Sequence, residues 1–352
     1  MSMGLKTSAH SRIPQLAHFQ FDYEFVQDRI TVIFGPSGCG KSSLLRSMVG
    51  LPSPLECTQL TLGEQNLLRL PTHQRPIVLS AQKPDLLDHL SVQENLRFGF
   101  NRRKGKDCAD YFDAVCTATG AINLITRRTN QLSGGEIQRV AFARALATPA
   151  TWHLFDEPLT HLDRESRRRI THWLKQSQQS DPKSIVYVTH DIAEAMDLAD
   201  DVVILGDSGI EQIGGRHTLM HWLGNQDTGV NLLACSFISG ELSEGLIALK
   251  LDQHTLWVPC TSSIPYENPS YIELSYKDVS ITLDEPARTS ILNILPCKVS
   301  AIESKGEATT RVQLNLGTQT LWAEITQRSC RELGLQIGLS VWAQVKGVSI
   351  RS

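Results

Sequence analysis

Apolar positions in the first part of the chain alternate between short runs and helical patterns. Aromatic side chains at every second position from Phe19 to Phe25 predict a strand with one buried face, and the apolar run Ile30–Phe34 predicts a fully buried strand. Residues 41–50 predict a helix that ends at Gly50, because a glycine followed by Pro52 is typical of a helix end. Further apolar runs predict four more buried strands: Ile77–Ser80, Trp152–Phe155, Ile185–Thr189 and Val202–Leu205. Strands alternating with helices predict an α/β fold with a mostly parallel sheet.

The pattern changes after about residue 225, where helical periodicity fades and short β-type runs take over. The clearest runs are Leu246–Leu251, Thr255–Val258, Tyr271–Leu274, Arg311–Leu316, Thr320–Ile325 and Val341–Val345. Short strands separated by Gly, Pro, Asn and Ser are typical of small all-β barrels. We therefore predict a first domain over 1–225 and an all-β domain over 226–352, divided into two sub-barrels near residue 286.

A faint internal repeat supports that division. A Thr-Leu-Trp segment containing Trp257 precedes Lys277-Asp278-Val279-Ser280-Ile281, and a second Thr-Leu-Trp segment containing Trp322 precedes Lys346-Gly347-Val348-Ser349-Ile350. Duplicated small barrels and chance similarity between β-rich segments are both compatible with this pattern, and we favour duplication.

Composition narrows the class of protein. A chain of 352 residues with 41% hydrophobic and 20% charged residues has room for two or three domains and a full core. A net charge of −3 argues against bulk electrostatic capture of nucleic acid or anionic lipid. Eight cysteines without a C-x-x-C pair predict a reduced compartment. Met1–Gln15 has no apolar core of a secretory signal, and no apolar run is long enough to span a bilayer.

A glycine-rich phosphate-binding loop follows the predicted strand Ile30–Phe34. Its motif, G-x-x-x-x-G-K-S, and the serine after it comprise Gly35, Pro36, Ser37, Gly38, Cys39, Gly40, Lys41, Ser42 and Ser43. Glycines let successive N–H groups surround phosphate oxygens, and the following helix adds its positive dipole end. Lys41 can contact the β- and γ-phosphates of a nucleotide, and the Ser42 hydroxyl can contact Mg²⁺. We therefore predict a P-loop NTPase that binds ATP and Mg²⁺.

Two later strands end in residues suited to hydrolysis. Asp156 follows a buried strand and is placed to hold Mg²⁺, directly or through water, and Glu157 is placed to polarise the attacking water. His190 follows the run Ile185–Thr189, so it should emerge at the same sheet edge and hydrogen-bond the γ-phosphate. By itself, an Asp-Glu pair or a single histidine at a helix start is weak evidence for a hydrolytic site. Both features together with the phosphate loop are stronger evidence for one.

A second candidate anion site lies at Ser133, Gly134, Gly135 and Glu136, which open a helix with an apolar face. Leu132-Ser133-Gly134-Gly135-Glu136, followed by Gln138-Arg139 and Ala143-Arg144-Ala145, resembles the signature of ABC ATPases. The order of phosphate loop, Gln82, signature, Asp156–Glu157, Asp163 and His190 matches that family, and the resemblance covers about residues 30–212.

The resemblance implies a head-to-tail homodimer with ATP between the phosphate loop of one copy and the signature of the other. It implies that Gln82 contacts Mg²⁺ and senses the membrane partner, that Glu157 is the catalytic carboxylate, and that Asp163 communicates across the dimer. His161 departs from the family pattern, because a small or amide residue is commoner there. The family usually stacks an aromatic ring on adenine, and Phe19 and Phe21 are the candidates here, although both lie close to Lys41 in sequence.

The C-terminal part resembles the oxyanion-binding barrel of molybdate-importer ATPases. The matching segments are 289–295, 320–325 and 341–346. Ser290 and Lys346 align with positions that the family uses for the oxyanion, while Ile291-Leu292 replaces an Ala-Arg pair and Gly347 replaces a serine. The barrel is therefore expected either to bind molybdate or to serve only as a dimer clamp.

These observations predict the ATP-hydrolysing subunit of an ABC importer, most similar to those for molybdate or tungstate. The implied partners are two transmembrane permease subunits and a periplasmic or extracellular substrate-binding protein, with the chain on the cytoplasmic side of the inner membrane and no nucleic acid bound. Import of sulfate, sugar, polyamine or iron remains an alternative. Two other classes are a soluble ABC ATPase acting on DNA or ribosomes, and an oxyanion-storage protein with a vestigial ATPase.

Overall fold

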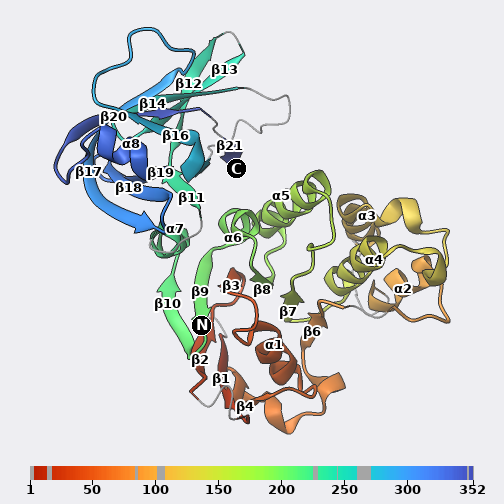
Figure 1. The fold of residues 1–352 in the computed structure, drawn as a ribbon. Coiled ribbons are helices and arrows are strands. Elements are labelled where there is room, and N and C mark those ends of the chain that lie inside the picture. The colour runs from red at the N-terminus through yellow and green to blue at the C-terminus, as the bar shows by residue number, and fades with distance from the viewer. Residues whose placement is uncertain are drawn as a thin grey trace. The chain divides into compact units, whose positions relative to one another are not determined.

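The chain forms two compact units that divide between Leu219 and Met220 (Figure 1). The computed structural model describes residues 4–13, 18–83, 86–100, 108–224, 229–243, 245–259, 271–346 and 349–351. Within those ranges, no helix has both the length and the apolar character needed to cross a bilayer. The domain boundary predicted at residue 225 and the sub-barrel division near residue 286 stay predictions.

The N-terminal unit alternates strands and helices. Its strands are β1 (Leu5–Ser11), β2 (Gln20–Phe25), β3 (Ile30–Phe34), β4 (Leu55–Leu62), β5 (Gln65–Asn66), β6 (Ile77–Ser80), β7 (Trp152–Asp156), β8 (Ser184–Thr189), β9 (Asp201–Gly206) and β10 (Gly209–Gly214). Its helices are α1 (Lys41–Val49), α2 (Val92–Phe100), α3 (Cys108–Thr119), α4 (Gly134–Ala147), α5 (Arg164–Ser180) and α6 (Ile192–Leu198), with α7 (Arg216–Gly224) at the division between the units.

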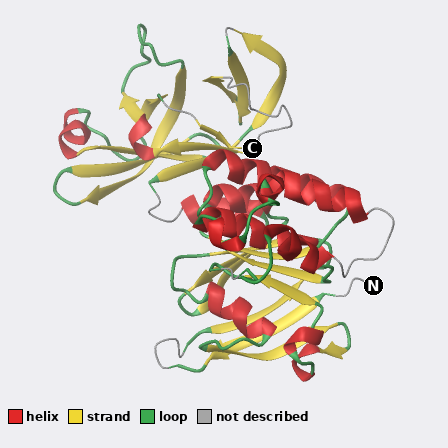
Figure 2. Cartoon of the chain, turned by 90° about the vertical axis from the view of Figure 1, so that its right-hand side faces the viewer, coloured by secondary structure: helices red, strands yellow, loops and turns green. Residues whose placement is uncertain are grey.

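The ten strands form one sheet in the order β5-β4-β1-β2-β10-β9-β3-β8-β7-β6. Strands β9, β3, β8, β7 and β6 run parallel, with Ile33 paired to Val188 and Phe155 paired to Tyr187. Helix α1 packs against β4, β6 and β7, while α6 packs against β3 and β8, and Figure 2 shows helices on both faces of this sheet. The predicted P-loop α/β fold with a mostly parallel sheet is confirmed.

The parallel strands are buried because their residues are apolar on both faces. All five residues of β3 are buried, as are all six of β8. Helix α1 ends where glycine was expected, since Gly50 adopts φ 79° and its N–H bonds back to the carbonyl of Ser47. The carboxyl ends of β3, β7 and β8 therefore meet at one edge of the sheet, where the candidate polar residues emerge.

In the antiparallel part of the sheet, β2 corresponds to the strand predicted over Phe19–Phe25, whereas β1 and β4 were not predicted. Strand β1 pairs with β2 and with β4, in both cases antiparallel. Its buried positions are Leu5, Thr7 and Ala9, so a threonine and an alanine take the places where large apolar residues would mark a strand. Buried positions do alternate along β1, but the residues at those positions are too small or too polar for the sequence to indicate a strand.

The C-terminal unit is almost entirely β-structure. Its elements are β11 (Val230–Ala234), β12 (Ser236–Ser243), β13 (Leu246–Leu251), β14 (His254–Pro259), β15 (Tyr271–Ser275), β16 (Val279–Thr282), β17 (Asn293–Lys305), β18 (Thr309–Asn315), β19 (Thr320–Thr326), α8 (Gln327–Glu332), β20 (Ser340–Val345) and β21 (Ser349–Arg351). They form three sheets in the orders β11-β15-β21, β12-β13-β14 and β16-β20-β17-β18-β19. The predicted all-β fold is confirmed.

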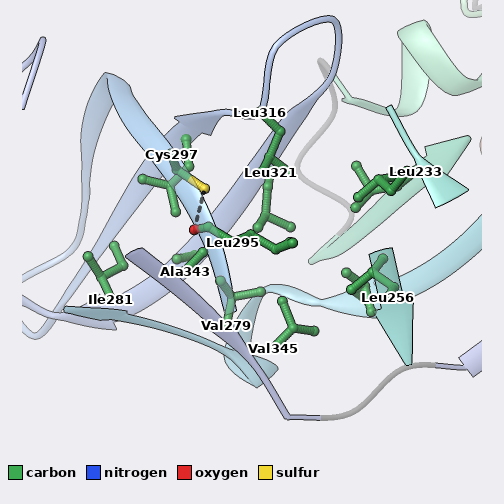
Figure 3. Packing of buried hydrophobic residues seen from close by; sticks show 14 of the residues in the cluster. Leu233, Leu256, Val279, Ile281, Leu295, Cys297, Leu316, Leu321, Ala343 and Val345 are labelled. Carbon is green, nitrogen blue, oxygen red and sulfur yellow. Dashed lines mark hydrogen bonds between the residues drawn. The ribbon is translucent and has the colours of Figure 1, made fainter. Parts of the chain in front are cut away.

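We call the residues before and after the predicted division near residue 286 the two halves of this unit. Each half contributes a strand to a sheet of the other half. The late strand β21 pairs with β15, and the early strand β16 pairs with β20. Side chains from both halves also enter one apolar cluster, in which Leu256 and Val279 lie with Leu295 and Val345 (Figure 3). Each half therefore completes the other's sheet and core.

Two asparagines join the halves reciprocally. Asn231 Nδ2 donates to the Trp322 carbonyl at 2.9 Å, and its Oδ1 accepts from the Trp322 N–H at 2.7 Å. Asn293 makes the same pair of bonds to Trp257, at 2.9 Å and 2.7 Å. The two tryptophans are those of the predicted sequence repeat, so the repeat corresponds to equivalent positions in space. We call these four residues the asparagine clasps.

Candidate nucleotide site

The phosphate loop connects β3 to α1, as its motif requires. Gly38 and Gly40 adopt φ 90° and 98°, which a side chain would strain. Gly35 is required for a different reason, because a Cβ there would lie 2.2 Å from the Leu205 carbonyl oxygen on β9. The main-chain N–H groups of the loop thus open onto the edge of the sheet where β7 and β8 also end.

Lys41 holds its charge inside this loop. The residue is 5% exposed, and its Nζ donates to the carbonyls of Gly35 and Pro36, at 2.7 Å each. Carbonyl oxygens solvate an ammonium group but do not neutralise it. The buried positive charge therefore remains uncompensated by these bonds, and the phosphates of a nucleotide are anions that compensate it.

Asp156, at the end of β7, faces the loop. Its Oδ1 accepts from Ser42 Oγ at 2.9 Å, and it is 4% exposed. Burial raises its pKa, the bond from Ser42 opposes that shift, and the neighbouring Glu157 adds to it. A buried carboxylate beside a hydroxyl is an all-oxygen donor set that suits Mg²⁺, which stabilises the ionised carboxylate.

Glu157 lies between two other predicted residues. Its Oε2 accepts from Gln82 Nε2 at 3.2 Å, and its Oε1 lies 3.0 Å from His190 Nδ1. The backbone of Glu157 is left-handed, with φ 46°, a conformation that costs a non-glycine residue on the order of 1–3 kcal/mol. The structure thus brings the three predicted catalytic residues together just beyond the carboxyl ends of β6, β7 and β8.

Ser133 and Glu136 form a capping box at the start of α4. Ser133 N donates to Glu136 Oε2 at 2.8 Å, and Glu136 N donates to Ser133 Oγ at 3.4 Å. The bonds from Ser133 lower the pKa of Glu136. Within the described ranges, the hydrogen bonds of these two side chains are to each other and to Arg127, and none reaches the phosphate loop. Gly134 has open space where a Cβ would stand.

Asp163 caps the next helix, α5, by accepting from Ser166 N at 2.8 Å. That bond lowers the pKa of Asp163. The residue is exposed, as expected of a group that meets a second molecule.

Several predicted contacts need correction. Phe19 and Phe21 are 0% and 2% exposed within the core around α1, so neither ring is available to stack on adenine. Cys39 is 1% exposed, and burial raises the pKa of its thiol. Its side chain is a buried filler of the loop, and the predicted contribution of the Cys39 main chain to phosphate binding stays a prediction. The sequence alone could not separate these roles, because aromatic and thiol groups serve in cores and in sites alike.

Gln138 was part of the signature resemblance but had no predicted role. It is 2% exposed, and its Nε2 donates to the Glu157 carbonyl at 3.0 Å. Thr160 Oγ1 donates to the same carbonyl at 3.0 Å. An amide among the apolar residues that α4 buries was the available signal, since a buried polar group needs a partner.

Ser290 and Lys346 lie at one end of the β17–β20 pair in the C-terminal unit. Asn293 opposes Val345 in the register, and both predicted residues are exposed just beyond it. Thr289 Oγ1 donates to Gln344 Oε1 at 3.3 Å, which ties the two segments together. Gly347 lies outside the described residues.

Comparison with known proteins agrees with this geometry. A family model described as ABC transporter matches residues 19–160, and one described as TOBE domain matches residues 289–351. Molybdenum import ATP-binding protein ModC of Albidiferax ferrireducens is 35% identical over 340 residues, covering 94% of this chain and 92% of that protein. The protein of the same name in Vibrio parahaemolyticus is 34% identical over 352 residues, covering 95% and 94%.

A solved dimeric structure of a bacterial ABC transporter cassette also matches. It is 25% identical with a TM-score of 0.51, covering 60% of this chain and 98% of that one. The P-loop fold and the two family models define the nucleotide-binding ATPase subunit of an ABC transporter. Identity above 30% over nearly the whole length is more specific: the chain belongs to the family of molybdenum import ATP-binding proteins.

Proposed function

We propose that this chain hydrolyses ATP to drive import of molybdate or tungstate through a separate permease pair. The observation that carries the ATPase part is the convergence of Glu157, Gln82 and His190 beside the Ser42–Asp156 pair. The names of the relatives support the cargo. The absence of basic excess argues against the alternative of a nucleic-acid-acting ATPase.

In the proposed reaction, Lys41 exchanges its bonds to loop carbonyls for phosphate oxygens. Ser42, Asp156 and Gln82 would hold Mg²⁺, which neutralises charge on the phosphates when bound. Glu157 accepts a hydrogen bond from the attacking water and orients it in line with the γ-phosphate. His190 reaches the γ-phosphate while its Nδ1 remains beside Glu157. These assignments rest on side chains that already lie within hydrogen-bond distance of one another.

We further propose that the site is completed by a second copy. The N–H and hydroxyl donors at the start of α4 make no bonds to the phosphate loop of their own chain within the described residues, and a helix start is suited to bind a γ-phosphate. Two nucleotides would hold a symmetric dimer closed, and hydrolysis would release it. Asp163 would contribute from the loop beside the interface.

Substitution Glu157→Gln tests this mechanism. The variant keeps a hydrogen-bonding group of the same size but cannot act as a base. We expect ATP binding to persist, turnover to fall by about 10²–10⁴-fold, and size-exclusion chromatography to show an ATP-dependent dimer. Normal turnover in this variant would refute the assignment of Glu157.

The permease would contact a groove on the N-terminal unit. A hollow of about 660 Å³ is lined by Asp88, Leu90, Glu94, Arg128 and Asn130, close in sequence to Gln82. A hollow lined by acidic, basic and apolar side chains is suited to bind the end of a short amphipathic segment of the permease. We expect Asn130→Trp, which fills the hollow, to abolish co-sedimentation with membranes of the source cells while ATP binding is unchanged. Such binding would place the chain peripherally on the cytoplasmic face.

Cargo is tested separately in cells. In a strain lacking the chromosomal copy, we expect the wild-type chain to restore molybdenum accumulation measured by mass spectrometry, and Glu157→Gln to fail. Restored sulfate or iron uptake without molybdenum would reassign the cargo. Calorimetric titration of the full chain with molybdate, tungstate and sulfate, repeated with Ser290→Ala and Lys346→Ala, decides whether the C-terminal unit binds oxyanion or only clamps a dimer.

A further inference from the structure

A chain of hydrogen bonds connects the main chain of Glu157 to the loop before α5. Gln138 Nε2 donates to the Glu157 carbonyl at 3.0 Å. Gln138 Oε1 accepts from the His161 N–H at 3.2 Å and lies 3.1 Å from His161 Nδ1. His161 is the residue that departs from the family pattern at this position, so the contact of its ring nitrogen with Gln138 depends on the side chain particular to this chain.

The partners fix where the proton on His161 lies. The Glu157 carbonyl can only accept, so the NH₂ group of Gln138 must face it. The oxygen of the same amide then faces His161, whose backbone N–H can only donate. His161 Nδ1 must therefore carry a hydrogen in order to bond to Gln138, whichever the state of Nε2.

The left-handed peptide of Glu157 is held at both ends. Its N–H donates to the Val188 carbonyl at 3.0 Å, and its carbonyl accepts from Gln138 and from Thr160. An unusual backbone conformation persists only where its surroundings fix it. Without Gln138 the carbonyl keeps only the N–H and hydroxyl donors of Thr160, and rotation of the peptide would move the carboxylate away from Gln82 and His190.

The same helix contacts the His161 main chain directly. A Cβ on Gly135 would lie 3.1 Å from the His161 carbonyl oxygen, so glycine permits a close approach there. Helix α4 thus meets the loop before α5 at two points, Gly135 and Gln138. Any displacement of the start of α4 acts on the loop and on the Glu157 peptide together.

We propose that Gln138 and His161 are positioning residues that hold the catalytic carboxylate in its reactive orientation and link it to the signature at the start of the same helix. This inference rests on the proposed role of Glu157. In this arrangement, contact of the signature with the partner's nucleotide is passed to the Glu157 of its own chain through one buried amide. The His161 side chain fixes that amide by a second bond to its oxygen.

The test compares steady-state ATPase of the full chain carrying His161→Ala, His161→Asn or Gln138→Ala. Asn places an N–H donor near the position of Nδ1, so it can restore the bond to Gln138. We expect His161→Ala to lower kcat about tenfold with an unchanged KM for ATP, and His161→Asn to recover most of it. The double variant with Gln138→Ala should be no slower than Gln138→Ala alone, because both changes remove one connection. His172→Ala, at an exposed position on α5, is the matched control.

The outcomes separate this inference from the proposed function. If Glu157→Gln abolishes turnover while His161→Ala and Gln138→Ala keep wild-type kcat, the positioning role is refuted and the base assignment stands. If His161→Asn is as slow as His161→Ala, the hydrogen bond is not the cause and the inference fails. If Glu157→Gln hydrolyses ATP normally, both fail together. Thermal unfolding midpoints equal to that of the wild type exclude general misfolding as the source of a lower kcat.

Discussion

The Asn293 side chain makes the hydrogen bonds to Trp257 that the main chain of a neighbouring strand would otherwise make. Its amide bonds both to the N–H and to the carbonyl of Trp257, as a residue on an adjacent strand would. Asn293 is 6% exposed, so water does not readily take over these bonds. The main-chain N–H and C=O of the half-buried Trp257 therefore depend on one residue for these bonds.

We expect Asn293→Ala to destabilise the C-terminal unit by about 2 kcal/mol, because two main-chain groups of the half-buried Trp257 lose their partner. The measurement is urea unfolding of the full chain followed by tryptophan fluorescence. Asn315→Ala is the control, since the Asn315 side chain bonds within an exposed turn and water can replace that bond. Equal midpoints for the two variants would contradict the clasp's contribution.

Residue-scale chemistry was only partly predictable. The phosphate loop could be predicted in full because its function resides in consecutive main-chain groups. The asparagine clasps could not be predicted, because asparagine in a β-rich stretch usually indicates a turn. The tryptophan that each asparagine contacts also lies far away in the sequence. Gln138 was missed for the same reason: its partner, the Glu157 carbonyl, is a main-chain atom that every residue possesses.

In the C-terminal unit, turns between strands also make contacts that hold the elements together. Asp252, in the turn between β13 and β14, accepts from Thr318 N at 2.8 Å and from Thr318 Oγ1 at 2.6 Å. Thr318 lies in the turn between β18 and β19. The corresponding hairpins of the two halves are thus connected tip to tip, and the bonds from Thr318 lower the pKa of Asp252.

This connection has a defined pH dependence. The depressed pKa means that ionised Asp252 stabilises the fold above its unfolded-state pKa of about 4, and that this contribution is lost as the pH falls through the folded-state value. Asp252→Asn keeps a residue that tolerates the φ of 56° but removes the charge. We expect it to lower the thermal midpoint at pH 7, and the difference from wild type to shrink progressively as the pH falls below about 4. A difference that is constant with pH would show that charge is irrelevant there.

Element prediction succeeded for the parallel strands, including the edge strand β6, and missed β1 and β4 in the antiparallel part of the sheet. Strands β3, β6, β7 and β8 carry continuous apolar runs, which the parallel core requires. Strand β4 has an irregular sequence of buried and exposed positions, and β1 uses Thr7 and Ala9 on its inner face. Such strands are defined by the strands they pair with, and this pairing cannot be predicted from a single sequence.

At the scale of the whole molecule, the proposed site is shared between two copies. The phosphate loop and the three residues around Glu157 lie together in one chain, whereas the capping box at Ser133 bonds only locally within the described ranges. The sequence could supply both motifs but not their distance in the folded chain, because that distance is set by how the strands and helices pack.

Mixing two inactive variants tests this sharing. Lys41→Ala removes the phosphate-binding charge, and Ser133→Arg blocks the signature. Each should be inactive alone, and the mixture should regain ATPase activity, up to roughly one quarter of wild type if subunits exchange freely and each intact site works alone. No recovery after subunit exchange, verified by co-purification of differently tagged copies, would mean that each chain builds its own complete site.

The exchanged strands and paired amides of the C-terminal unit have a consequence for how such a chain can change over generations. A duplication that leaves two self-sufficient modules can be reversed by losing either one. Here β16 and β21 each finish the other module's sheet, and Asn231 and Asn293 each satisfy the opposite tryptophan. Deleting one module would strip the survivor of a strand and of its amide partner, so we expect that a single deletion cannot leave either module able to fold by itself.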